Sequence, residues 1–120
     1  MNTIKVKRIY EESSVDDGYR ILVDRLWPRG FTKEKANIDK WAKSISPSTE
    51  LRKTFNHDAD TMDEFARRYI YELDTNGYSD EFINIVKERL SEGNVTFLYA
   101  AKNVDMNHAI VLMNWIKEKI

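Results

Sequence analysis

Two polar segments of this chain combine cations, a carboxylate and a histidine in a pattern suited to binding an anion. Residues 24–30 read DRLWPRG and residues 101–108 read AKNVDMNH. Arginine recognises phosphate or carboxylate through planar, paired N–H groups, and histidine exchanges a proton near neutral pH. We therefore predict a site for a small phosphate- or carboxylate-bearing ligand, with or without catalysis. The candidate ligand-binding residues in these segments are Arg25, Trp27, Arg29, Lys102 and Asn107, and the acid–base candidates are Asp24 and His108.

Each of these residues also has a purely structural interpretation. Asp24 can hold Arg25 or cap a backbone turn, and Trp27 beside a proline is commonly a packed anchor. Asn107 can be a plain helix cap, and His108 a surface histidine. If arginines and a helix N-terminus surround His108, they favour its neutral form, whereas Asp24 at close range would favour the imidazolium.

Residues outside the two segments extend or compete with this site. Arg52 is a further ligand-binding candidate, and with Tyr69 and Glu72 it lies on predicted helices that could line the rim of the site, although ion pairing along a helix explains these residues equally well. His57, Asp58 and Asp60 have a faint metal-ligand spacing, but without further ligands a solvated loop is the better interpretation. We predict no metal.

Composition excludes several classes of protein. The 120 residues fit one domain, residues 1–120, and the absence of cysteine removes disulfides, thiolate metal sites and cysteine nucleophiles. The dinucleotide fingerprint, the Walker loop and the common hydrolase and metalloprotease motifs are missing, so we predict no cofactor. With no secretory signal and no apolar run of membrane-spanning length, we expect a cytosolic protein without a membrane partner.

Hydrophobic periodicity predicts the elements that must position the site. Strands are expected at 3–9, 20–24 and 95–100, and helices at 38–45, 48–55, 61–73, 79–90 and 107–120, with Thr61 and Ser79 at helix starts. The fold class is therefore α/β, a compact three-layer domain with a small, mostly parallel sheet flanked by helices. About nine residues join the first two strands, which is short for a parallel crossover, so a hairpin is the alternative. In such sheets ligands bind beyond the carboxyl ends of the strands, where both polar segments begin.

Charge distribution leaves two rival functions open. Residues 1–55 hold 12 Lys and Arg against 8 Asp and Glu, whereas residues 56–92 hold 4 against 10. A nucleic-acid-associated module is one rival, and a pocketless interaction protein is the other. The sequence does not determine the oligomeric state. The basic face of the first rival would use Lys5, Lys7, Arg8, Arg20, Arg25 and Arg29, with Trp27 and Tyr10 for stacking.

The same residues carry a resemblance to a known family. The run DGYRILVDRLWPRG at 17–30, with KRIY at 7–10, PSTELRK at 47–53, LYAAK at 98–102 and NHA at 107–109, resembles the YeaO-like branch of the domain-of-unknown-function family 488. The resemblance covers nearly the whole chain and implies a compact α/β fold in a bacterial or archaeal cytosolic protein, with no assigned activity. It also implies that longer relatives carry cysteines near positions 99 and 107, where this chain has Tyr99 and Asn107.

Overall fold

A parallel β-sheet forms the middle of the protein. The computed structural model describes residues 2–54, 59–102 and 107–120, and in them the sheet has four strands in the order β1-β4-β2-β3. These strands are β1 (Ile4–Arg8), β2 (Tyr19–Leu22), β3 (Lys40–Trp41) and β4 (Val95–Tyr99). Every pairing is parallel, with Ile4 opposite Val95 and Ile21 opposite Phe97. The α/β class and the shared sheet for the three predicted strands are confirmed.

The hairpin alternative for the first two strands is wrong. β1 and β2 lie on opposite sides of β4 and run parallel to it. The short connection can join two parallel strands because it runs close to the face of the sheet. Gly18 adopts φ +65°, and a Cβ there would lie 2.0 Å from the Asn94 carbonyl oxygen. Asp17 in this connection accepts a hydrogen bond from Lys7 Nζ, and its carbonyl accepts one from Thr96 Oγ1.

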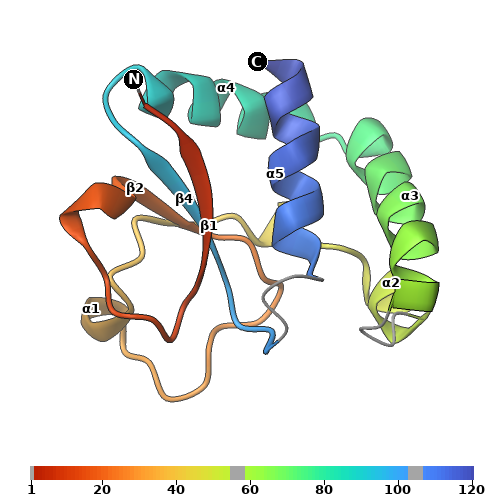
Figure 1. Ribbon diagram of the computed structural model, residues 1–120, viewed down its shortest axis with the longest axis horizontal. Helices are drawn as coiled ribbons and strands as arrows, with labels where there is room; N and C mark the ends of the chain where they lie inside the picture. Colours follow the sequence, from red (N-terminus) through yellow and green to blue (C-terminus); the bar gives the residue numbers. More distant parts are fainter. Residues whose placement is uncertain (1, 55–58, 103–106) are drawn as a thin grey trace.

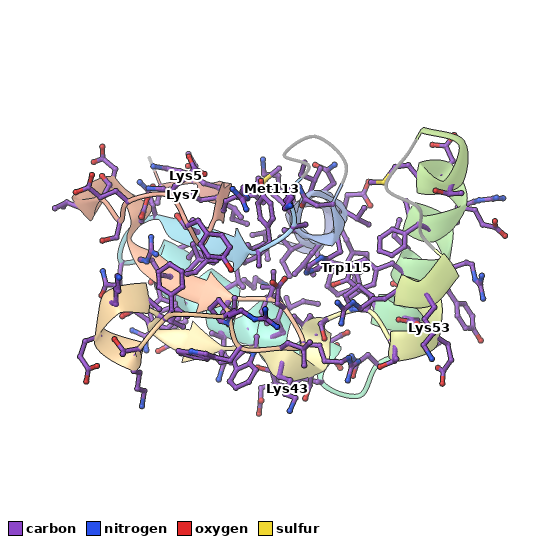
Figure 2. The ribbon with its side chains drawn as sticks, turned by 90° about the horizontal axis from the view of Figure 1, so that it is seen from below. Lys5, Lys7, Lys43, Lys53, Met113 and Trp115 are labelled. Carbon is purple, nitrogen blue, oxygen red and sulfur yellow. The ribbon has the colours of Figure 1, made fainter. Side chains whose placement is uncertain are left out.

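Helices cover one face of the sheet (Figure 1). α5 (His108–Lys119) and α4 (Ser79–Leu90) pack directly on strands, and α3 (Ala59–Thr75) packs against both helices. α2 (Thr49–Thr54) leads into α3. Figure 2 shows Trp115 on the side of α5 that faces α3, where its indole N–H donates to Asp74 Oδ1 at 3.0 Å. The main core lies between this layer and the sheet.

The opposite face carries a thinner layer made mostly of loops. Here the short helix α1 (Lys33–Ala36) and the segment after β2 cover Leu22 and Leu98 with a second apolar cluster. Trp27, Phe31 and Ile38 pack against that cluster. The predicted three layers are therefore present, but the second flank is one turn of helix supported by loops.

The predicted helix at 38–45 is wrong. Asn37 adopts a left-handed conformation at φ 50° and ends α1, after which the chain extends into β3. The amides of Asp39 and Ala42 donate to the carbonyls of Arg20 and Leu22, so this segment satisfies its backbone through β2 rather than through a helix. The helical spacing of Ala42 and Ile45 reflects burial of both side chains. A 3₁₀ turn, Lys43–Ile45, completes the segment.

Two predicted helix starts also differ from the structure. α3 begins at Ala59, so Thr61 lies inside the first turn rather than at its cap. Ser79 is the first residue of α4 rather than its cap, and its hydroxyl donates to the Leu73 carbonyl. The Ser79 side chain therefore joins α4 to the end of α3.

Candidate functional site

A cavity of about 830 Å³ opens at the carboxyl ends of β2 and β4. The loop after β2 contributes Asp24, Arg25, Trp27 and Arg29, and α2 contributes Arg52. The segment that follows β4 contributes Lys102, Asn107 and His108. All eight site residues predicted from the sequence thus line one cavity. Its volume suits a small organic ligand, because known ligand sites span roughly 300–1,000 Å³.

Asp24 joins the two strand ends at the base of the cavity. Its Oδ2 accepts the Ala100 amide at 2.9 Å, and its carbonyl accepts the Trp41 indole N–H at 2.8 Å. Its Oδ1 is buried and has no hydrogen-bond partner among the described residues, although His108 Nε2 lies 3.1 Å away. Asp24 therefore holds the site together and also presents a carboxylate oxygen beside the histidine.

His108 is the first residue of α5 and is fixed from two sides. Its Nε2 lies 3.1 Å from the Val23 carbonyl oxygen, and its ring meets the Tyr69 ring edge-on at a centroid distance of 6.3 Å. Asn107 caps the helix through its side-chain oxygen, which accepts the Ile110 amide at 3.2 Å. The sequence analysis named two kinds of neighbour for His108, arginines with a helix N-terminus on one side and the Asp24 carboxylate on the other. The close contact in the structure is with the Asp24 carboxylate.

Arg25 and Trp27 are partly committed to the framework. The Arg25 guanidinium donates to the Pro47 carbonyl, with Nη2 at 3.1 Å. The Trp27 indole donates to the Phe31 carbonyl at 2.8 Å and stacks edge-on against Trp41. These contacts agree with the anchor interpretation of Trp27, and they fix the loop that carries Arg29.

The remaining cations are available to a ligand. Arg29, Arg52 and Lys102 are exposed and line the cavity, and no partner is found for their charged groups in the described parts of the chain. Lys53, which sequence reasoning missed, joins them from α2. The sequence feature that could have identified Lys53 is its position next to Arg52 in the PSTELRK run. Four cations that lack a partner in the described parts of the chain surround one opening, and together they produce a positive field there.

The Tyr69 and Glu72 side chains support the cavity from behind instead of forming its rim. The Tyr69 hydroxyl is buried and donates to the Ile45 carbonyl at 2.6 Å. Burial, aided by the charges of Glu72 and Asp24, raises the pKa of Tyr69 well above its ordinary value. Glu72 accepts the Ser48 amide at 2.9 Å, which fixes the start of α2. The rim interpretation of these two residues is therefore wrong.

Phe65 and Pro47 form apolar parts of the wall that the sequence did not indicate. Neither has a polar group that would mark it in the sequence. Phe65 reaches the site because α3 packs against α5, and Pro47 because Arg25 binds its carbonyl. Such residues become visible only once the helices are placed.

The basic face required by the nucleic-acid alternative is broken up. Arg20 is 3% exposed and binds Asp17 and the carbonyls of Ala36 and Asn37. Figure 2 shows Lys5 and Lys7 together on β1, at the opposite end of the molecule from Lys53. Both β1 lysines bind the 15–17 turn through Asp16 and Asp17.

Metal and membrane features are not found among the described residues. They contain no group of three acidic or histidine side chains placed to hold a metal ion. The faint pattern at 57–60 lies partly outside the described residues, which exclude His57 and Asp58. Within the same residues, no helix combines the length and apolar character needed to cross a bilayer.

Comparison with known families identifies the chain's relatives. Residues 3–120 match the family described as "Inactive DUF488-N3 subclade". The chain belongs to this subclade. The resemblance seen in the sequence is thereby confirmed.

Its relatives within the family are similar along nearly their whole length. The protein named YeaO of Escherichia coli K12 is 41% identical over 114 residues, which cover 95% of this chain and 96% of YeaO. Rv3073c of Mycobacterium tuberculosis H37Rv and Mb3100c of Mycobacterium bovis are each 38% identical over 109 residues, 91% of this chain and 89% of theirs. All three are described as uncharacterized proteins. No solved structure matches the chain.

Proposed function

We propose that this DUF488-N3 protein is a cytosolic binding protein for a small organic anion, a phosphate- or carboxylate-bearing compound, held in the cavity beyond β2 and β4. One observation carries the proposal. Four cations without partners among the described residues, Arg29, Arg52, Lys53 and Lys102, surround a cavity at the carboxyl edge of a parallel sheet. Ligands of open α/β proteins bind at this edge.

The cavity is larger than an inorganic anion requires. A site of about 830 Å³ also has apolar walls from Trp27, Pro47 and Phe65. Apolar walls with a few convergent polar groups are typical of sites for organic ligands. We therefore expect a compound that joins an anionic group to an apolar or planar part, with the size of a sugar phosphate or a mononucleotide.

Binding without turnover agrees best with the chemistry of the site. The subclade is described as inactive, and the chain has no cysteine for thiol catalysis. Asp24 and His108, the acid–base candidates, each hold backbone groups of the two strand ends. Both residues therefore have a positioning role that does not require a reaction.

Amide NMR titration tests the proposal with sulfate, a sugar phosphate and a mononucleotide as probes. We expect saturable shifts at residues 24–30, 52–53, 101–102 and 107–108, with the organic anions binding more tightly than sulfate. Arg29→Gln and Arg52→Gln should each weaken binding about tenfold, as expected for a lost charge-assisted hydrogen bond. Lys87→Gln, on the exposed surface of α4, removes the same charge away from the cavity and should change nothing.

Two results would overturn the proposal. One is the absence of saturable shifts with every probe at low salt. The other is binding of single-stranded nucleic acid, by the wild type and by Arg52→Gln alike, that collapses between low and moderate salt, because such binding follows the phosphate backbone. The second result would favour the nucleic-acid alternative instead.

A further inference from the structure

The hydrogen bond at Nε2 fixes the tautomer of His108. Nε2 lies 3.1 Å from the Val23 carbonyl oxygen, and a carbonyl oxygen can only accept. Nε2 therefore carries a hydrogen and donates it to Val23. The second neighbour of Nε2, Asp24 Oδ1 at 3.1 Å, is also an acceptor and requires the same assignment. In the neutral ring, the lone pair is then on Nδ1.

The Nδ1 atom of His108 is the ring nitrogen left for a ligand. Among the described residues, Nδ1 has no hydrogen-bond partner. In the same residues, the one buried side-chain polar atom that lacks a partner is Asp24 Oδ1. Nδ1 is therefore not buried, and it is accessible. His108 lines the cavity at the start of α5. A proton taken up at Nδ1 would create an N–H donor there, at the N-terminal end of α5.

His108 has one carboxylate at contact distance and several cations elsewhere in the same cavity. Asp24 lies at contact distance from the loop after β2, while the phenol of Tyr69 from α3 is neutral and meets the ring edge-on. The cations that share the cavity are Arg25 and Arg29 after β2, Arg52 and Lys53 on α2, and Lys102 after β4. These cations repel an imidazolium until an anion neutralises them, whereas Asp24 stabilises it.

We propose that His108 is a proton-linked ligand contact, and this inference rests on the proposed function. Binding of the anion is coupled to uptake of one proton from solvent at Nδ1. The resulting N–H donates to an oxygen of the ligand, and Asp24 offsets the positive charge of the ring. No covalent bond to the ligand forms or breaks. His108 thereby makes the affinity of the site depend on pH.

Sulfate titrations at about pH 8 and about pH 6 test this coupling, because sulfate keeps its charge throughout that range and His does not. We expect wild-type affinity to rise about tenfold at the lower pH, the gain of one charge-assisted hydrogen bond. His108→Gln has an amide that can still donate to Val23, but it does not titrate, so its affinity should be the same at both values. His57→Gln, the matched change at the other histidine, should keep the full pH dependence.

A measurement on the unmodified protein guards against a misfolded variant. Heteronuclear NMR of the His108 ring at about pH 8 should show the hydrogen on Nε2, and sulfate should then shift the ring toward the doubly protonated form. Equal sulfate affinity at both pH values, or pH dependence retained in His108→Gln, would overturn the inference and leave the binding function intact. A neutral ring protonated on Nδ1 would overturn it as well. Failure of sulfate and of both organic anions to bind at either pH overturns the proposed function itself.

Discussion

Asp17 is the residue on which the short crossover between β1 and β2 depends. Its carboxylate accepts Lys7 Nζ at 3.1 Å, the Ser14 amide at 3.0 Å and the Arg20 guanidinium. Burial by itself would raise the pKa of Asp17, but these three hydrogen bonds, together with the positive charge of Lys7, outweigh burial and hold its pKa below the ordinary value. Arg20 in turn binds the carbonyls that end α1. One carboxylate thus connects β1, β2 and the loop layer.

Asp17→Asn is expected to lower the free energy of unfolding by about 3–5 kcal/mol, because it leaves the buried Arg20 guanidinium without its counter-charge. Urea denaturation followed by circular dichroism measures the change. Asp16→Asn is the matched control, since the Asp16 side chain is exposed and the residue bonds Lys5 through its carbonyl. A loss of equal size in both variants would contradict the assignment of this role to Asp17.

Elements with a regular pattern were predictable from the sequence, and elements created by tertiary contacts were not. Alternation identified β1, and aliphatic runs identified β2 and β4, because a strand buried on both faces must be apolar. β3 has two residues and no pattern, and it exists because β2 offers it backbone partners. The place of the cavity was predictable for a related reason: parallel strands bring their carboxyl ends to one edge. The walls that α2 and α3 add to the cavity were not fully predictable, because they depend on helix packing that no local sequence pattern indicates.

Gly18 and Gly30 both have positive φ, but a side chain would meet a close neighbour only at Gly18. Replacing each by alanine therefore distinguishes the cost of a steric overlap from the cost of backbone strain. Gly18→Ala should be severely destabilising, because its Cβ would overlap the Asn94 carbonyl oxygen at 2.0 Å and backbone must move. Gly30→Ala, with φ +84° and open space around the Cβ, should cost about 1–2 kcal/mol for backbone strain alone. Thermal and urea denaturation of both variants measure the difference. Equal losses of stability in the two variants would contradict a steric limit set at Gly18 by Asn94.

At the scale of the whole molecule, a nearly neutral protein concentrates positive charge at one opening. The net charge is −1, yet Arg25, Arg29, Arg52, Lys53 and Lys102 line the cavity with Asp24 as its one carboxylate among the described residues. The acidic side chains that the structure describes on α3 and α4 are not among the residues that line this opening. Such a separation concentrates positive electrostatic potential at the cavity.

The stability of the whole fold should decrease in acid through Asp17. Since its pKa in the folded protein lies below the ordinary 3.8, the unfolded chain binds the proton first as pH falls. The stabilisation by Asp17 is therefore complete above the ordinary value and is lost as pH falls through the folded value. Urea denaturation from neutral pH to about pH 3 should show the stability gap between wild type and Asp17→Asn narrowing. A gap independent of pH would contradict the role of this carboxylate.

The strand order has a consequence for how the protein is made. β4 is the partner of both β1 and β2, and it is synthesised after the other strands of the described sheet. Ile4 can therefore pair with Val95 only after about 90 further residues have been synthesised. On the ribosome, the first strands therefore emerge with their hydrogen-bonding edges open, while α3 and α4, which depend on local contacts, can form early. A nascent chain shorter than about 95 residues has no central strand on which to assemble. Folding of the sheet thus follows the synthesis of β4, and until then the N-terminal strands are the part of the chain that is exposed to aggregation or to binding by a chaperone.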